Sequence, residues 1–194
     1  MEPARYQALV LAGGSARRFG GADKGLQLLD GRPFVAHTLA ALAAQSAPPA
    51  SCLISANRNL DIYRAFGHPV LSDSRPGYQG PLAGIAEGLA ELSEDWLLVV
   101  PCDVVALPAD FATRLFAEAD ERTDAVCACD AERHHPALVL LHRRVRASLD
   151  DFLHGDSRRL RDWLAGLNTR EAFFATPFPN LNNPEAVAAL QRRG

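Results

Sequence analysis

The sequence lacks the features that would mark a membrane protein, a secreted protein or a nucleic-acid-binding protein. No apolar run approaches the about 20 residues that a membrane-spanning helix needs. The formal net charge is −3, so no overall positive field would attract nucleic acid. The apolar run near the N-terminus is too short for a signal peptide, and glycines follow it. We therefore expect a cytoplasmic protein with no membrane partner and no nucleic-acid partner.

The few cysteines of the chain do not form a metal-binding motif, and nothing in their spacing indicates a disulfide. The cysteines are Cys52, Cys102, Cys127 and Cys129, and no two of them form a C-x-x-C motif. Cys127 and Cys129 lie two residues apart in a strand-like run and would share one face of that strand. Cytosolic chains of this kind rarely use disulfides or thiolate zinc sites, so the sequence favours reduced thiols in the core.

What the sequence does contain is enough apolar material for one globular domain. It has 194 residues, of which 48% are hydrophobic, and this fraction argues against disorder. We find no internal repeat, no low-complexity tract and no linker. The sequence therefore predicts a single domain over residues 1–194.

The order of predicted elements indicates an α/β fold with a mostly parallel sheet. Through residue 119, apolar runs typical of buried strands alternate with segments typical of helices. Strands joined in this way are linked by right-handed crossovers and should be parallel. The expected strands are residues 8–11, 51–56, 69–71 and 95–100, and the expected helices are residues 33–45, 59–66, 81–92 and 108–119.

The second part of the chain departs from this alternation. Only the segment DAERHH separates the strand-like runs 124–129 and 136–141, and it is too short for a crossover helix. These runs should form an antiparallel hairpin near one edge of the sheet. The other elements expected here are helices over residues 146–153, 157–165 and 184–191 and a strand over residues 171–175.

The segment YQALVLAGGSARRFGGADKGL, residues 6–26, is the most specific stretch of the chain. Its apolar run ends in Gly13 and Gly14, and such an end should leave free backbone N–H groups for phosphate oxygens. Arg18 and Lys24 follow and would supply the positive charge that a polyphosphate needs. The G-x-x-x-x-G-K-[ST] and G-x-G-x-x-G motifs are both absent, since no Ser or Thr follows Lys24 and the glycines are adjacent. We infer a nucleoside triphosphate site that uses neither motif.

Small and polar residues lie where four of the predicted strands end. The first strand ends at residues 11–14, the second at Ser55 and Asn57, the third at Asp73 and the fourth at Asp103. In open α/β sheets, ligands bind outside the carboxyl ends of the strands. The convergence of these strand ends therefore predicts one nucleotide site at this edge of the sheet.

Asp103 is the best candidate for a metal ligand. It closely follows the strongest strand, and Mg²⁺ takes one or two carboxylates together with phosphate oxygens. The alternative is that Asp103 only caps the turn before Pro108. Asp73 also has two interpretations, because it either begins a loop or contacts ribose hydroxyls or the N–H edge of guanine.

Lys24 and Arg18 are the candidate catalytic cations. Phosphoryl transfer is catalysed mainly by positioning and electrostatics, so both would neutralise charge on the α-phosphate and on the departing pyrophosphate. The alternative is that both are solvated surface charges.

His135, Asn180 and Asn182 are polar residues of the second half of the chain. His135 precedes Pro136 at the start of a strand, and no Asp or Ser spacing supports a catalytic triad. We therefore expect a structural role or a substrate contact for His135. Asn180 and Asn182 are either turn residues or contacts to the edge of a heterocycle.

Arg158 and Arg159 are the arginines of the second half that could bind an anion. They follow Ser157, which is a candidate helix N-cap. Arginines on a helix form either a solvated face or a site for a second anionic substrate. Both interpretations remain open from the sequence.

A series of motifs runs along nearly the whole chain. The first, LAGGSARRFGGADKGL, ends in Gly-Gly-x-Asp-Lys-Gly. The later motifs are Pro33-Phe34 with His37, SANR at 55–58, Asp73, Gly80–Gly84, Pro101–Asp103, His135-Pro136, Gly155–Arg159, and Phe178 with Asn180, Asn182 and Pro184. In content and order this series resembles the molybdenum cofactor guanylyltransferase family of nucleotidyltransferases.

The resemblance implies a single Rossmann-like, three-layer α/β domain. It implies transfer of GMP from GTP to the molybdopterin cofactor, with pyrophosphate as the second product and Mg²⁺ as cofactor. Proteins of cofactor biosynthesis and of molybdoenzyme maturation are further candidate partners, and we expect a monomer. GTP-binding elements would lie within residues 6–105 and molybdopterin-binding elements within residues 130–185.

The resemblance also implies roles by position. Arg18, Lys24 and Asp103 would be catalytic, with Asp103 also binding Mg²⁺. Ser55 stands where the family often has Asn, so Asn57 is expected to share the nucleoside contact. The expected GTP-binding residues are Leu11, Ala12, Gly13, Gly14, Lys24, Ser55, Asn57, Asp73, Gly84 and Asp103. A transfer between two substrates needs a second anionic site, for which we expect His135, Arg158, Arg159, Asn180 and Asn182 to bind molybdopterin.

Two other functions remain open. One is a different nucleotidyltransferase of this fold, such as a cytidylyltransferase acting on molybdopterin or on a sugar phosphate. The other is a non-catalytic, nucleotide-binding regulatory domain. The DKGL ending and the Asn-rich segment argue against the first, and the presence of Lys24 and Asp103 argues against the second.

Overall fold

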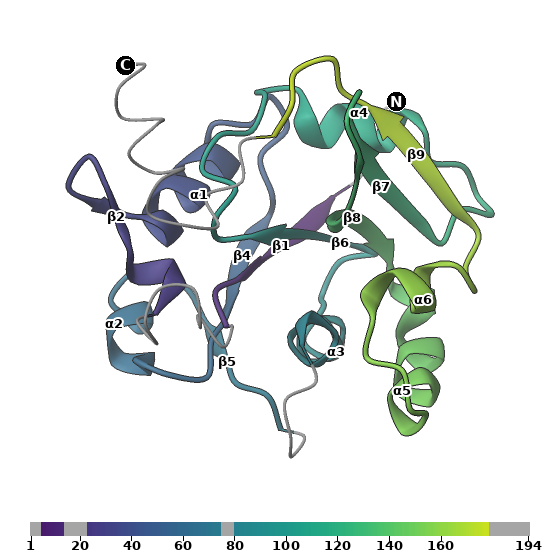
Figure 1. Ribbon diagram of the computed structural model, residues 1–194, viewed down its shortest axis with the longest axis horizontal. Coiled ribbons are helices and arrows are strands. Elements are labelled where there is room, and N and C mark those ends of the chain that lie inside the picture. The colour runs from purple at the N-terminus through teal and green to yellow at the C-terminus, as the bar shows by residue number, and fades with distance from the viewer. Residues whose placement is uncertain (1–4, 14–22, 75–79, 179–194) are drawn as a thin grey trace.

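The computed structural model of the chain describes residues 5–13, 23–74 and 80–178. Their centre is a seven-stranded sheet with the strand order β5-β4-β1-β6-β8-β7-β9 (Figure 1). All of its strands are parallel except β8, which pairs antiparallel with β6 and β7. The mostly parallel sheet with an antiparallel hairpin near one edge is therefore confirmed. The strands are β1 (Tyr6–Leu11), β4 (Ser51–Ser55), β5 (Val70–Leu71), β6 (Trp96–Pro101), β7 (Ala125–Cys129), β8 (His134–His142) and β9 (Thr169–Phe173).

Helices cover both faces of this sheet and make the three layers (Figure 1). α1 and α4 pack on one face, and α3, α5 and α6 pack on the other. No helix in the described part of the chain has both the length and the apolar character that crossing a membrane requires. The helices are α1 (Phe34–Ala43), α2 (Leu60–Arg64), α3 (Pro81–Ala90), α4 (Phe111–Ala117), α5 (Arg146–His154) and α6 (Leu160–Leu164), with short 3₁₀ turns η2 (Lys24–Leu26) and η3 (Arg143–Val145).

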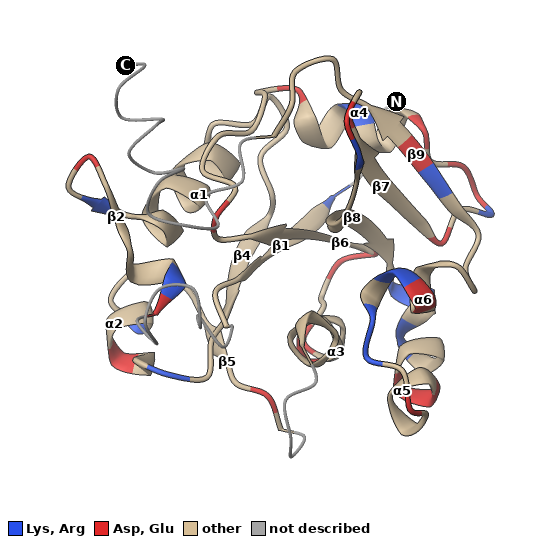
Figure 2. Ribbon diagram, in the orientation of Figure 1, with Lys and Arg blue, Asp and Glu red and all other residues tan. Residues whose placement is uncertain are grey.

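β1 is buried along its whole length because both faces of the sheet are covered. Its side chains alternate between two apolar cores, with Ala8 and Val10 in one and Leu9 and Leu11 in the other. The central strands carry no charge, and the charged residues lie around the periphery (Figure 2). Charged groups that could form a site are therefore found at the ends of the central strands and not along them.

A small hairpin follows the turn that contains Lys24. β2 (Leu28–Leu29) pairs antiparallel with β3 (Arg32–Pro33). Asp30 and Gly31 form the connection with φ values of 50° and 76°. Two successive residues with positive φ are typical of a two-residue hairpin loop.

Two helices, α4 and α6, begin three residues later than predicted. α4 starts at Phe111 rather than at Pro108, because a turn comes first in which the Phe111 N–H donates to the Pro108 carbonyl at 3.0 Å. α6 starts at Leu160 rather than at Ser157. The prediction that Ser157 is its N-cap is wrong, because Arg159 occupies that position with an extended backbone.

The four cysteines are buried free thiols, which agrees with the prediction of reduced core residues. Burial raises the pKa of Cys52 to about 11 and that of Cys127 to about 12. These side chains are therefore neutral thiols near neutral pH and are poor nucleophiles and metal ligands.

Candidate functional site

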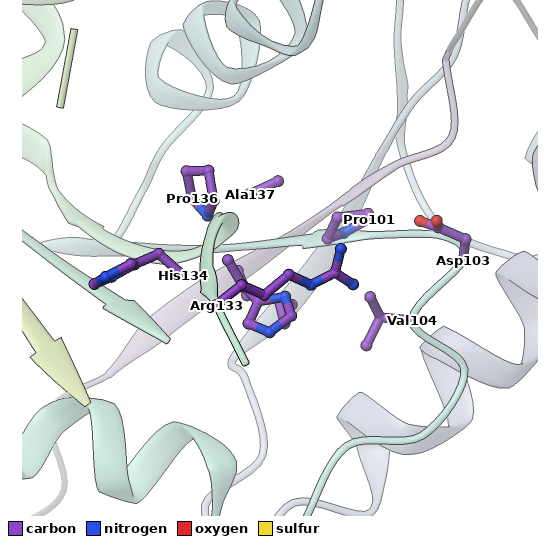
Figure 3. A pocket seen from close by; sticks show the side chains of 9 residues that line it. Pro101, Asp103, Val104, Arg133, His134, Pro136 and Ala137 are labelled. Atoms are coloured by element: carbon purple, nitrogen blue, oxygen red, sulfur yellow. The ribbon is translucent and has the colours of Figure 1, made fainter. Parts of the chain in front are cut away.

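Two pockets open at the edge of the sheet where the parallel strands end. The β1–β4 pocket lies beside the ends of β1 and β4 and the start of α3. The β6–β8 pocket lies between the end of β6 and the start of β8 and has a volume of about 160 Å³ (Figure 3). The first is lined by Leu11, Gly13, Ser55, Asn57, Asp73, Gly80, Pro81 and Gly84. The second is lined by Pro101, Asp103, Val104, Arg133, His134, His135, Pro136, Ala137 and Leu138.

The backbone at the end of β1 differs from the prediction. The N–H groups of Ala12 and Gly13 both donate to the Ser55 carbonyl, each at 2.9 Å. The pairing of β1 with β4 thus continues past the last strand residue, and the expectation that these two N–H groups are free is wrong. A Cβ at Gly13 would come no nearer than 3.6 Å to its neighbours, so the backbone is still open on this side. The contact of Leu11, Ala12 and Gly13 with GTP stays a prediction.

Asn57 and Asp73 form a reciprocal pair on the wall of the β1–β4 pocket. Asn57 Nδ2 donates to Asp73 Oδ2 at 2.7 Å, and the Asp73 N–H donates to Asn57 Oδ1 at 2.8 Å. Burial raises the pKa of Asp73; the hydrogen bond from Asn57 opposes this shift, and the nearby charge of Glu87 adds to it. Asn57 therefore holds the Asp73 carboxylate at the pocket.

Gly84 serves the packing of α3 against the sheet. A Cβ at this position would overlap Ser55 Oγ and would lie 3.1 Å from Leu11 Cδ2. Only a glycine lets the helix come this close to β1 and β4. The predicted GTP contact of Gly84 stays untested, whereas its structural role is evident.

Lys24 and Asp103 meet, although 79 positions separate them in the sequence. Lys24 Nζ donates to Asp103 Oδ2 at 2.6 Å, and the side chains are 23% and 8% exposed. The Cys102 N–H donates to the Leu11 carbonyl at 3.0 Å, so Asp103 adjoins the end of β1. Asp103 lines the β6–β8 pocket, and the adjoining Leu11 lines the β1–β4 pocket. Two of the predicted catalytic residues are thus brought together at this edge of the sheet.

Asp23 fixes the turn that carries Lys24. Its Oδ1 accepts hydrogen bonds from the Tyr63 hydroxyl at 2.6 Å and from the Gly25 N–H at 3.2 Å. Its Oδ2 accepts one from Asn59 Nδ2 at 3.0 Å. Burial and the bond to Asp23 raise the pKa of Tyr63, so its hydroxyl stays a donor. Sequence reasoning missed this cluster, because no local pattern links Asp23 to a tyrosine 40 positions away.

Asp103 is the residue of this site that could help to hold a metal ion. Within the residues that the structure describes, no group of three or more His, Cys, Asp or Glu side chains is placed to hold a metal. Asp103 offers one carboxylate beside Lys24. Mg²⁺ needs only one or two protein carboxylates when phosphate oxygens fill its other positions. The donor set therefore fits a nucleotide-bound Mg²⁺.

His135 belongs to a buried polar pair at the start of β8. Its Nε2 lies 2.7 Å from Asp130 Oδ2, with side chains 9% and 2% exposed. Asp130 Oδ1 also accepts the N–H groups of Glu132 at 2.9 Å and of Arg133 at 3.0 Å. Burial acts to raise the pKa of Asp130, but the bonds from His135 and the backbone outweigh it and hold that pKa far below its usual range. The structural role is thus found for His135, which also lines the β6–β8 pocket.

Arg158 and Arg159 line neither pocket. The Arg158 guanidinium donates to the carbonyls of Gly155 and Ser157, the latter at 2.9 Å. The Arg158 carbonyl lies 3.8 Å from the place of a Cβ on Gly80, so this loop approaches the start of α3. The structure does not bring the two arginines into one pocket with His135, and their contact with molybdopterin stays a prediction.

Several predicted residues fall outside the part of the chain that the structure describes. They are Gly14, Arg18, Asn180 and Asn182, together with the expected helix over residues 184–191.

One protein family and several known proteins resemble this chain. The model of the MobA-like NTP transferase domain matches residues 8–172. A molybdenum cofactor guanylyltransferase from Shewanella sediminis (strain HAW-EB3) is 40% identical over 190 residues, covering 96% of this chain and 95% of the relative. One from Shewanella sp. (strain ANA-3) is 43% identical over 191 residues, with 96% and 95% covered. The solved structure of molybdopterin-guanine dinucleotide biosynthesis protein A from Archaeoglobus fulgidus has the same fold, with a TM-score of 0.76 at 17% identity over 96% of this chain and 97% of that one. The family match and these relatives establish that the chain belongs to the MobA-like NTP transferase family and is a nucleotidyltransferase.

Proposed function

We propose that the chain transfers GMP from GTP to the molybdopterin cofactor, giving the guanine dinucleotide form of the cofactor and pyrophosphate. The observation that carries this proposal is the Lys24–Asp103 ion pair at the ends of the central strands. Asp103 lines one pocket there, and the neighbouring end of β1 lines a second. A transfer between two substrates needs a charged centre with a binding space on each side. The relatives named molybdenum cofactor guanylyltransferase supply the identity of the two substrates.

GTP would lie against the β1–β4 pocket with its phosphates directed toward Lys24. The pocket itself has a volume of about 10 Å³, so most of the nucleotide would lie outside it. Asp73 would accept hydrogen bonds from the ribose hydroxyls or from the N–H edge of guanine, and Asn57 would hold it in place for that contact. Leu11, Ala12 and Gly13 would border the phosphates. Arg18 would add a second cation.

In the proposed reaction, a phosphate oxygen of molybdopterin attacks the α-phosphorus of GTP. The bond from that phosphorus to the oxygen bridging to the β-phosphate breaks, and its electron pair leaves with pyrophosphate. The nucleophile is already an anion, so no side chain has to remove a proton and no covalent enzyme intermediate forms. Lys24 would neutralise the charge that collects on the leaving pyrophosphate, with Asp23 and Tyr63 keeping its turn in position.

Mg²⁺ is the cofactor that we propose, and Asp103 would hold it. Such an ion, when bound, withdraws negative charge from the phosphate oxygens. The Asp103 carboxylate is 8% exposed and lies beside the end of β1, where the phosphates of GTP would pass.

Turnover with each nucleotide tests the proposal. The full chain would be incubated with Mg²⁺, molybdopterin and GTP, CTP, ATP or UTP, with pyrophosphate measured and the product identified by mass. We expect the guanine dinucleotide from GTP and little turnover with the others. Turnover with CTP instead of GTP would establish the rival cytidylyltransferase. Binding of GTP with no pyrophosphate release in the presence of molybdopterin would establish a non-catalytic domain.

A further inference from the structure

The β6–β8 pocket has an arginine that the sequence analysis did not single out. Arg133 lies in the connection between β7 and β8, and its side chain extends across the pocket toward Pro101, Asp103 and Val104 (Figure 3). Arg133 is exposed, and within the described residues no carboxylate lies at ion-pair distance from its guanidinium. An arginine that has no acidic partner in the described part of the chain and that faces Asp103 (Figure 3) can bind an anionic ligand.

The backbone of Arg133 is held firmly although its side chain is exposed. The Asp130 N–H donates to the Arg133 carbonyl at 3.0 Å, and the Arg133 N–H donates back to Asp130 Oδ1 at 3.0 Å. The second oxygen of Asp130 is bound by His135 at 2.7 Å. The Asp130 carboxylate therefore fixes the N–H of Arg133 and the Asp130 backbone N–H fixes its carbonyl. This restraint on the backbone lowers the entropy lost when the guanidinium binds a ligand.

The direction of β8 places this arginine opposite the GTP site. β8 is antiparallel to β6, so its first residues lie at the same edge of the sheet as the end of β6. In the strand order, β4 and β1 lie on one side of Asp103 and β8 lies on the other. The residues of the β1–β4 pocket would contact GTP, and the β6–β8 pocket is then the space from which a second substrate can reach the same phosphorus.

We propose that the β6–β8 pocket binds the terminal phosphate of the acceptor substrate and that Arg133 is the residue that binds it. This inference rests on the proposed function for the identity of the acceptor. The ligand class is a phosphate monoester, which the forked guanidinium of an arginine can bind through two parallel hydrogen bonds. The pocket, at about 160 Å³, is smaller than the about 300–1,000 Å³ typical of sites that enclose a whole drug-sized ligand. It fits a phosphate group, with the remainder of the acceptor outside it.

Separate titrations of the two substrates into Arg133→Met test the assignment. This change removes the guanidinium and keeps most of the aliphatic side chain. We expect affinity for molybdopterin to fall by about tenfold or more, because a charge-assisted double hydrogen bond is lost. Affinity for GTP should stay within about twofold to threefold, since Arg133 lines the β6–β8 pocket and not the β1–β4 pocket.

Arg143→Met is the matched control. Arg143 immediately follows the other end of β8 and is 55% exposed, with Asp95 at 3.5 Å. The Arg143→Met substitution removes the same charge at a residue that lines neither pocket. The affinities for molybdopterin and for GTP should therefore change by no more than about twofold, as expected for an exposed ion pair. A loss of molybdopterin affinity in both variants would mean that net charge alone is responsible, and it would overturn the assignment.

The remaining outcomes separate the inference from the proposed function. Equal molybdopterin binding by Arg133→Met and the parent chain overturns the inference, as does a selective loss of GTP binding. If the parent chain binds no molybdopterin and releases no pyrophosphate with it, the proposed function fails. A phosphorus NMR titration with inorganic phosphate then tests whether the β6–β8 pocket binds phosphate. Phosphate binding that is lost in Arg133→Met supports a phosphate site, and binding that is equal in both proteins, or absent from both, overturns it.

Discussion

The turn that carries Lys24 depends on Tyr63, and two substitutions test this dependence. Tyr63 is completely buried, and its hydroxyl donates to Asp23 Oδ1 at 2.6 Å. Tyr63→Phe removes this donor and leaves the ring in place. Because the lost bond is to a charged group, the free energy of unfolding should fall by about 1.5–3 kcal/mol.

Gly25→Ala should destabilise the same turn by crowding it. A Cβ at Gly25 would overlap the Tyr63 hydroxyl and would lie 3.2 Å from Ala12 Cβ and 3.3 Å from Tyr63 Cζ. The tyrosine cannot move aside, because its ring is buried and its hydroxyl is bound to Asp23. Overpacking of this kind costs about 1–3 kcal/mol.

The double variant shows whether the two residues act through this one contact. With the hydroxyl absent, the added methyl group loses its worst overlap. Gly25→Ala with Tyr63→Phe should therefore be less destabilised than the sum of the single variants, by about 1–2 kcal/mol. Equilibrium urea unfolding gives each value from its midpoint, provided that the slope is unchanged. Additive effects would contradict the packing argument.

Activity and a matched tyrosine complete this test. Pyrophosphate release should fall in both single variants while they stay folded, because the support for Lys24 is weakened. Tyr6→Phe is the control, since the buried Tyr6 hydroxyl donates to the Ala47 carbonyl at 2.7 Å, at the other end of β1. It should lose about 0.5–1.5 kcal/mol of stability and keep its turnover. Full turnover in Tyr63→Phe would mean that this hydroxyl does not position Lys24.

Three further substitutions test other parts of the site. Asp103→Asn should lower Mg²⁺-dependent pyrophosphate release by on the order of a hundredfold or more, with little change in thermal unfolding, and normal turnover would leave Asp103 without a catalytic role. Gly13→Leu should lose GTP binding in a calorimetric titration, because the fold has room for a Cβ there and the side chain would occupy ligand space; unchanged affinity would exclude Gly13 from the site. Asp130→Asn should be destabilised most at neutral pH, since folding lowers the pKa of Asp130. That stabilisation is complete above the ordinary pKa of about 3.9 and is lost as the pH falls through the folded-state pKa. The free energies of unfolding of the variant and the parent chain, measured in urea, should therefore converge in acid. A difference between them that does not change with pH would contradict this reasoning.

The order of the elements could be predicted because it depends on local patterns. β1 and β6 are apolar along most of their lengths, and the glycines, prolines and polar residues between elements mark their ends. The starts of α4 and α6 were less predictable. The residues before them have the apolar spacing of a helix, but those at Pro108 form a turn and Arg159 has an extended backbone. The local sequence pattern does not distinguish residues that precede a helix from residues of its first turn.

The candidate site could be predicted only where sheet topology alone determines it. The convergence of strand ends predicted that Ser55, Asn57 and Asp73 lie near the end of β1, and they line one pocket with Leu11 and Gly13. The ion pair of Lys24 with Asp103 was not predicted, because Lys24 lies in a turn and not at a strand end. The cluster of Asp23 with Tyr63 and the position of Arg133 depend on which loops pack together in three dimensions. The same holds for the Ser55 carbonyl, which binds the N–H groups that were expected to be free.

The central place of β1 has a consequence for how the protein is synthesised. β1 lies between β4 and β6, and all of its residues are buried. The ribosome adds about 5–20 residues per second, so the β6 segment, Trp96–Pro101, emerges on the order of ten seconds after β1. For that interval one edge of an apolar strand has no partner and is open to pairing with other nascent chains. Lys24 can meet Asp103 only when β6 takes its place, so the catalytic centre is assembled by the same event that closes the exposed edge.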